Sequence, residues 1–303
     1  MTISTVLLAS RMDKKNAMDL SRNIFNFLRD KGIEVSVETR LSPKFDGLYA
    51  KDLSTVVADE IDCVIVVGGD GSIMRVSNSL NQENPPPVLG VNIGSIGFLD
   101  ETNQKRVFKD LEKVIKGEFI IEEVSKITAY LVKKNSEEIK LGNALNEILI
   151  ISSKSSKVLQ IAVKINGVFL SRSYSDGVII STSTGSTAYN LSAGGAIVFP
   201  TIDIMQLTTL NPFARSGLKP IIVPIDSEIE IELLRPRLNA KIIIDGQKEF
   251  KEIQPSSVIK IRKADTKFKF IRLSDDLNHN YFTRLKKKII GYLKVPLEDS
   301  PEE

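Results

Sequence analysis

A glycine-rich run, Gly68-Gly69-Asp70-Gly71, directly follows an apolar run and directly precedes a segment of helical character. Glycines let backbone N–H groups approach a phosphate closely, and the start of a helix adds partial positive charge. Asp70 is unusual there because a carboxylate repels phosphate, so it suits a general base facing a hydroxyl, or a magnesium ligand. A tight turn in which Asp70 caps the helix is the simpler alternative. Arg75, further along the helix, either reaches a phosphate or is a surface charge.

Two further segments carry polar groups suited to a nucleoside. Asn146 and Glu147 precede an apolar run, and an amide beside a carboxylate can donate to and accept from a diol. The segment 175–196 is rich in hydroxyl groups and contains Tyr189, which can stack on a base. An ordinary loop edge is the alternative for the first segment, and a solvated loop for the second.

Cysteine and histidine are nearly absent, which removes several kinds of site. The 303-residue chain has one cysteine, Cys63, and one histidine, His279. These numbers exclude a disulfide within the chain and leave too few ligands for a Cys/His zinc site. His279 lies in a polar stretch and is expected at the surface. Catalysis is therefore expected to depend on carboxylates, hydroxyls, backbone amides and a hard cation.

The overall charge and hydropathy exclude further classes. Lys and Arg number 41 against 38 Asp and Glu, a net charge of +3, which argues against a protein built to bind nucleic acid. No apolar stretch approaches the roughly 20 residues that span a bilayer, so we expect no membrane partner and a cytoplasmic setting. The chain has no G-x-x-x-x-G-K-[ST] loop, and no G-x-G-x-x-G follows its first expected strand.

The first part of the chain alternates strand and helix patterns. Such a βαβ rhythm predicts a doubly wound parallel sheet, which binds ligands at the carboxyl ends of its strands. The expected strands are 5–9, 34–39, 62–67 and 88–91, and helical patterns cover 20–28, 72–80 and 106–115.

Short alternating runs dominate after about residue 122 and predict an all-β, sandwich-like domain. Asn166-Gly167 and Asp245-Gly246 stand between apolar runs and suit hairpin turns with positive φ. Residues 277–293 return to a helical pattern, and the lysine run 286–288 on it is interpreted as a solvated face. We expect an α/β nucleotide-binding domain over 1–122, a β-rich NAD-binding domain over 123–274, and a C-terminal helix and tail, 275–303, that pack on the first domain.

Five short motifs in this order resemble the NAD kinase family: GGDG at 68–71, NE at 146–147, SDG at 175–177, GSTAY at 185–189 and DGQ at 245–247. The first is shared with lipid kinases and phosphofructokinases, but the set is specific. The resemblance implies an α/β domain, a β-sandwich-like domain and a site between them.

The resemblance also implies roles for individual residues. Asp70 is expected to accept the proton of the adenosine ribose 2′-hydroxyl, and Asn146 and Glu147 to hold the ribose of the acceptor. Phe98 matches a phenylalanine near the adenine, and Tyr189 lies beside a ring. The full set of expected nucleotide-binding residues is Gly68, Gly69, Gly71, Arg75, Phe98, Asn146, Glu147, Lys157, Asp176, Ser186, Thr187, Ala188, Tyr189, Ser192, Asp245 and Gln247.

This sequence departs from the family pattern at Ser95 and Phe213, where histidines are common. The implied reaction is ATP + NAD → ADP + NADP, with polyphosphate as an alternative donor, NADH as an alternative acceptor, and Mg²⁺ or another divalent cation. A homodimer or homotetramer is expected by resemblance. The alternatives are a lipid or sugar kinase that uses GGDG, a non-catalytic NAD-binding module, and a dinucleotide oxidoreductase, which would lack its glycine fingerprint here.

Overall fold

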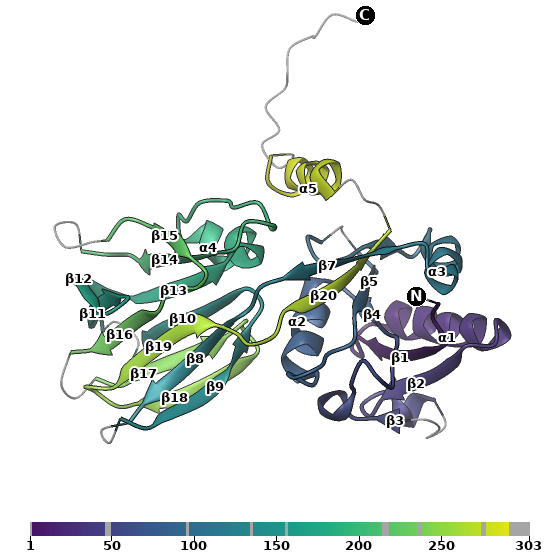
Figure 1. Cartoon of the computed structure of the whole chain (residues 1–303), viewed down its shortest axis with the longest axis horizontal. Coiled ribbons are helices and arrows are strands. Elements are labelled where there is room, and N and C mark those ends of the chain that lie inside the picture. Colours follow the sequence, from purple (N-terminus) through teal and green to yellow (C-terminus); the bar gives the residue numbers. More distant parts are fainter. Residues whose placement is uncertain are drawn as a thin grey trace, which may run out of the picture. The chain divides into compact units, whose positions relative to one another are not determined.

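The computed structural model describes residues 2–45, 50–94, 97–133, 136–154, 157–213, 218–234, 238–273 and 277–290. Contacts divide these residues into two compact units (Figure 1). Unit 1 contains the described residues of Met1–Val76, Pro86–Glu122 and Phe270–Glu303, and unit 2 those of Ser77–Pro85 and Glu123–Lys269. Ser95, one of the two departures from the family pattern, lies outside the described residues.

Unit 1 is an α/β unit whose helices and strands alternate along the chain. Its elements, some of which run a few residues past the division, are β1 (Thr5–Ser10), α1 (Lys15–Asp30), β2 (Glu34–Glu38), η1 (Ser42–Lys44), β3 (Ala50–Lys51), η2 (Leu53–Thr55), β4 (Cys63–Gly68), α2 (Asp70–Ser79), β5 (Val88–Asn92), β6 (Thr102–Asn103), α3 (Val107–Lys116), β7 (Ile120–Val124), β20 (Phe268–Arg272), α5 (Leu277–Leu285) and a π-helical turn over Lys286–Ile290.

The sheet of unit 1 runs in the order β3-β2-β1-β4-β5-β20-β7, with β6 beside β5. The strands from β3 to β20 pair in parallel. Leu89 and Val91 share one apolar core with residues of α1 and α3. Gly90 points to the opposite face, where Ile73 of α2 lies against it. Helices therefore cover both faces of a parallel sheet, as the strand and helix pattern predicts.

Unit 2 is built almost entirely of short strands. Its elements are β8 (Ile127–Val132), β9 (Glu138–Ala144), β10 (Glu147–Ser152), β11 (Leu159–Ile165), β12 (Val168–Ser175), β13 (Gly177–Thr182), η3 (Thr184–Thr187), α4 (Tyr189–Ser192), β14 (Ile204–Leu210), β15 (Ile221–Pro224), β16 (Ile229–Leu233), β17 (Ala240–Ile244), β18 (Lys248–Ile253) and β19 (Val258–Lys263).

These strands form two six-stranded antiparallel sheets, β15-β14-β13-β10-β17-β18 and β12-β11-β16-β19-β8-β9 (Figure 1). Both sheets contribute to one apolar core: Ile148 comes from the first, and Ile161 and Ile231 from the second. The chain therefore has a β-sandwich here, and the prediction of an α/β domain followed by a β-rich domain is confirmed.

Both predicted hairpin turns are present with the expected backbone. Asn166 and Gly167 join β11 to β12 with φ of 51° and 77°. Asp245 and Gly246 join β17 to β18 with φ of 50° and 64°. These left-handed values explain why an Asx-Gly pair stands at each turn.

The strand β20 belongs to a different sheet from the one that the sequence pattern predicts for it. Phe268–Arg272 lies inside the range expected for the β-rich domain, yet Phe270 pairs in parallel with Val88 of the first sheet. A short alternating run carries no information about which sheet it joins. No helix of the described residues is long and apolar enough to cross a membrane.

Candidate functional site

Asp70 lies at the carboxyl end of β4, at the first position of α2. The sheet order reverses between β1 and β4, and open α/β sheets bind ligands at such a switch point. The Asp70 carboxylate accepts hydrogen bonds from the backbone amides of Phe98 (3.0 Å) and Leu99 (3.1 Å). The carboxylate is therefore fixed by a neighbouring loop, and its side chain remains partly exposed.

The three glycines around Asp70 differ in their surroundings. A Cβ on Gly68 would lie 2.1 Å from the Ser72 hydroxyl, so this position has no room for a side chain. A Cβ on Gly69 or Gly71 would meet nothing within 4 Å. Glycine leaves these two positions without a side chain, so another group, such as a phosphate at the start of a helix, can approach the turn closely.

A second carboxylate, Asp100, lies beside Asp70. A Cβ on Gly97 would fall 1.9 Å from Asp70 Oδ1 and 2.4 Å from Asp100 Oδ2, so both carboxylates border the same small space. Asp100 Oδ2 accepts hydrogen bonds from the Gly97 amide and the Asn92 side chain, while its buried Oδ1 has no partner among the described residues. Burial, and then the charge of Asp70, raise the pKa of Asp100 to about 6.

Asp100 is a residue that sequence reasoning missed. The sequence shows a carboxylate directly after the Gly97-Phe98-Leu99 run. Nothing in its position along the chain indicates that it lies next to Asp70. Phe98, in contrast, was predicted to lie at the site, and its backbone does contact Asp70.

Arg75 is engaged by a buried carboxylate. Its guanidinium makes two hydrogen bonds of 2.8 Å to Glu38, whose side chain is 2% exposed. Glu38 also accepts from the Ser10 amide. The ion pair therefore links α2 to β2. The expected contact of Arg75 with a phosphate stays a prediction.

Asp245 organises the Asn146-Glu147 segment of unit 2. Its buried carboxylate accepts hydrogen bonds from the backbone amides of Leu145 (2.8 Å), Asn146 (2.7 Å) and Glu147 (3.1 Å). It also accepts one from the Asn78 side chain at 3.0 Å. Asp245 was expected to contact nucleotide, and the structure gives it four protein donors that set the backbone of the segment.

Two oxygens of this segment lack a partner. Asn146 Oδ1 and Glu147 Oε2 are buried and accept no hydrogen bond from any described residue. Glu147 is 8% exposed, and burial together with the charge of Asp245 raises its pKa to about 8. Buried polar atoms are normally satisfied, and a hydroxyl can donate to one oxygen and accept from another. These two unpartnered oxygens therefore suit a pair of ligand hydroxyls.

The hydroxyl-rich segment packs against these two residues. A Cβ on Gly185 would lie 2.1 Å from the Asn146 carbonyl oxygen. The backbone amide of Tyr189 lowers the pKa of Glu147, against the larger raising effects of burial and Asp245. The Ser186 hydroxyl is fully buried and exchanges hydrogen bonds with the Val198 backbone. Several expected residues therefore meet here, and of them Tyr189 is 45% exposed and open to a ligand. Among the expected nucleotide-binding residues of unit 2, the following side chains are partly or fully exposed: Thr187, Ala188, Tyr189 and Ser192 of this segment, and Gln247 after the turn at Asp245-Gly246.

Two expected residues lie elsewhere in unit 2. Asp176 precedes the amino end of β13, whereas Gly185–Tyr189 follows its carboxyl end. Lys157 is exposed just before β11, whose first residue pairs with Ser175. Lys157 and Asp176 therefore share one end of the sandwich, and Asn146 and Glu147 lie at the other end of β13.

The described residues contain no group of three or more His, Cys, Asp or Glu side chains able to enclose a metal ion. Mg²⁺ bound to a nucleotide needs few protein ligands because phosphates and water supply the rest.

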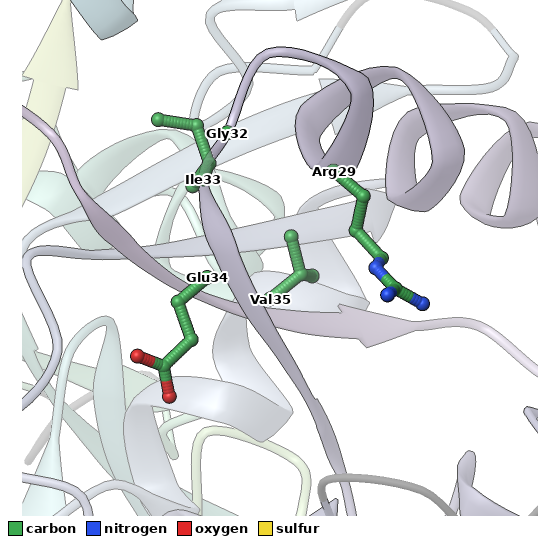
Figure 2. A pocket seen from close by; sticks show the side chains of 5 residues that line it. All are labelled: Arg29, Gly32, Ile33, Glu34 and Val35. Carbon is green, nitrogen blue, oxygen red and sulfur yellow. The ribbon is translucent and has the colours of Figure 1, made fainter.

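A hollow at the start of β2 is not a candidate site. It is lined by Arg29, Gly32, Ile33, Glu34 and Val35. Figure 2 shows the Arg29 and Glu34 side chains pointing in different directions. The hollow lies at the amino end of β2, whereas ligands bind parallel sheets at the carboxyl ends.

Comparisons with known proteins agree with this geometry. Residues 6–119 match the model of the ATP-NAD kinase N-terminal domain, and residues 145–273 match that of the ATP-NAD kinase C-terminal domain. An NAD kinase of Thermococcus gammatolerans is 34% identical over 281 residues, covering 93% of this chain and 98% of that protein. An NAD kinase of Methanothermobacter thermautotrophicus is 34% identical over 283 residues, covering 93% and 94%.

Two solved structures share the fold. Yeast NADH kinase, complexed with NADH, has a TM-score of 0.84 at 21% identity, over 100% of this chain and 90% of that one. An NAD kinase from Archaeoglobus fulgidus, in complex with ATP, has a TM-score of 0.71 at 25% identity, over 93% and 98%.

Proposed function

Because the chain belongs to the NAD kinase family, we propose that it transfers the γ-phosphoryl group of ATP to the 2′-hydroxyl of the adenosine ribose of NAD, giving NADP and ADP. The observation that carries this proposal is the pair of buried, unpartnered oxygens on Asn146 and Glu147. The hydroxyls of a ribose would satisfy both. The kinases of Thermococcus gammatolerans and Methanothermobacter thermautotrophicus support the assignment by name.

In this reaction the 2′-oxygen forms a bond to the γ-phosphorus while the bond from that phosphorus to the bridging oxygen of ADP breaks. The hydroxyl proton passes to the Asp70 carboxylate, which the Phe98 and Leu99 amides hold in place. Asn146 and Glu147 fix the ribose, and a positioned acceptor contributes much of the rate in phosphoryl transfer. The exposed ring of Tyr189 packs beside a ring of the dinucleotide.

Mg²⁺ enters as the complex with ATP, where it neutralises phosphate charge. The amides of Gly69 and Gly71, at the turn into α2 where no side chain intervenes, bind the phosphates. ATP is the proposed donor, supported by the ATP complex of the Archaeoglobus fulgidus relative. NAD is the proposed acceptor, and NADH is the alternative because the yeast neighbour is an NADH kinase.

We further propose that, within unit 1, α5 returns to the loop that holds Asp70. Arg284 donates a hydrogen bond of 2.9 Å to the Phe98 carbonyl and pairs with Glu101 at 3.2 Å. The Tyr281 ring lies 6.3 Å from that of Phe98. These contacts support the return of the helix to the loop that holds Asp70.

A homo-oligomer is also proposed. Tyr174 and Phe213 form an exposed aromatic pair, with ring centres 6.5 Å apart, beside Asp176. Val168 and Phe169, on the edge strand β12, are 69% and 54% exposed. A second copy would cover these apolar groups. Asp176 lies at the end of β13 opposite Asn146 and Glu147, so in a dimer it would contact the nucleotide bound by the other copy. Sedimentation analysis tests this assembly, and a cytoplasmic location stays a prediction.

A donor and acceptor panel tests the reaction. Purified chain is incubated with NAD or NADH and with ATP or polyphosphate, with and without Mg²⁺, and the products are separated by chromatography. We expect NADP from NAD and ATP only when Mg²⁺ is present. No 2′-phosphorylated product in any combination would contradict the proposal.

A further inference from the structure

Lys288 lies against the proposed proton acceptor. Its ammonium nitrogen is 3.5 Å from Asp70 Oδ2 and 5.3 Å from the centre of the Phe98 ring. Its side chain is 31% exposed, whereas Lys286 and Lys287 fall in the exposed class. The solvated face predicted for the lysine run therefore describes Lys286 and Lys287, but not Lys288.

The C-terminal helical segment holds Lys288 in that place. Tyr281, Arg284 and Lys288 recur at a spacing that puts them on one side of a helix. Tyr281 is buried beside Phe98, and Arg284 binds the Phe98 carbonyl. The described part of the segment continues as a π-helical turn over Lys286–Ile290. Two anchors one and two turns earlier therefore aim the ammonium at Asp70.

The site needs a cation at this point. A carboxylate at the end of β4 repels the phosphates that the neighbouring glycine amides attract. Arg75 is occupied by Glu38, and Arg284 by Glu101 and a carbonyl. The contact of Lys288 with Asp70 is longer than a strong ion pair, and an ammonium on a flexible stem can exchange one oxygen partner for another.

Resting on the proposed function, we propose that Lys288 is a phosphate-binding residue of the kinase site: paired with Asp70 before substrates bind, it moves to the transferring phosphoryl group of ATP. In that position it stabilises the negative charge of the equatorial oxygens while Asp70 is freed to take the hydroxyl proton. The π-helical turn after α5 thus supplies a catalytic group to the α/β unit.

Steady-state kinetics on Lys288→Met, Lys288→Arg and the surface control Lys287→Met give the first test. We expect Lys288→Met to lower kcat about 100-fold, as loss of a transition-state donor does, with KM for NAD unchanged. Lys288→Arg should recover much of the rate, and Lys287→Met should match wild type. Thermal unfolding of all three checks that the fold persists. Equal rates for Lys288→Met and Lys287→Met would overturn the proposal.

Calorimetric binding of MgATP separates contact with phosphate from an effect through Asp70. In the Asp70→Asn background, adding Lys288→Met should weaken MgATP binding several-fold, because the ammonium is then free to bind phosphate. No change in that background would show that Lys288 acts only on Asp70, and would overturn the proposal. This measurement needs no turnover, so it is independent of whether wild type forms NADP.

Discussion

Replacing Glu147 with glutamine should stabilise the folded chain at neutral and alkaline pH. Burial, and then the charge of Asp245, raise the pKa of Glu147 from 4.5 to about 8. Between these values the folded chain keeps a proton that the unfolded chain has released. Stability therefore falls as pH rises through this interval. A glutamine carries no charge, so the variant does not lose this pH-dependent part of the free energy of unfolding.

The magnitude follows from the width of the interval. The free energy of unfolding that wild type loses through Glu147 grows by about 1.4 kcal/mol for each pH unit. It reaches roughly 3 kcal/mol at pH 7. Glu147→Gln should therefore match wild type near pH 4.5 and unfold about 6 °C or more above it at pH 7. Below the ordinary carboxyl pKa both side chains are neutral, and the difference disappears.

Thermal unfolding followed by circular dichroism from pH 4.5 to 9 measures this difference. Asp265→Asn is the matched control because the Asp265 side chain is 83% exposed in the same unit. The control should follow wild type at every pH. Two outcomes would refute the raised pKa of Glu147 as the cause. One is unfolding temperatures of Glu147→Gln and wild type that change in parallel with pH, and the other is a variant less stable than wild type at pH 8.

Three further substitutions test the geometry. Gly97→Ala should lower kcat about 100-fold, because its Cβ would lie 1.9 Å from Asp70 Oδ1; Gly94→Ala, with no such neighbour, should retain wild-type turnover. Gly185→Ala should raise KM for NAD about tenfold or more, because its Cβ would lie 2.1 Å from the Asn146 carbonyl; an unchanged KM would show that this segment does not position the acceptor. Glu38→Gln should destabilise the chain by about 3 kcal/mol in urea unfolding, since it breaks a buried ion pair; a loss below 1 kcal/mol would mark the pair as a surface contact.

Local patterns predicted the parts of the fold that local physics determines. The run predicted as a strand over 62–67 forms β4 (Cys63–Gly68), which is buried along its whole length, as a central parallel strand requires. The Asn166-Gly167 and Asp245-Gly246 turns depend on two residues each, and both have the expected positive φ. The GGDG run lies at a strand end because a strand and a helix pattern flank it directly.

Long-range partners were not predictable in the same way. Asp245 binds the amides of Asn146 and Glu147, about a hundred positions earlier in the chain. Its neighbours along the chain indicate only a turn. The pairing of Arg75 with Glu38 and the approach of Asp100 to Asp70 likewise depend on the finished packing of unit 1. Residue types and spacing identify which groups could do chemistry, but the sheet order decides which of them meet.

The proton-acceptor role of Asp70 is the central claim, and one variant tests it most directly. In Asp70→Asn, kcat for NADP formation and the Kd for NAD, by calorimetry, are measured on the same preparation. Loss of a general base lowers turnover by about 10²–10⁴-fold, so kcat should fall by that amount while Kd changes by less than about threefold. Turnover retained within about tenfold, or a Kd that rises in step with the loss of kcat, would contradict the claim.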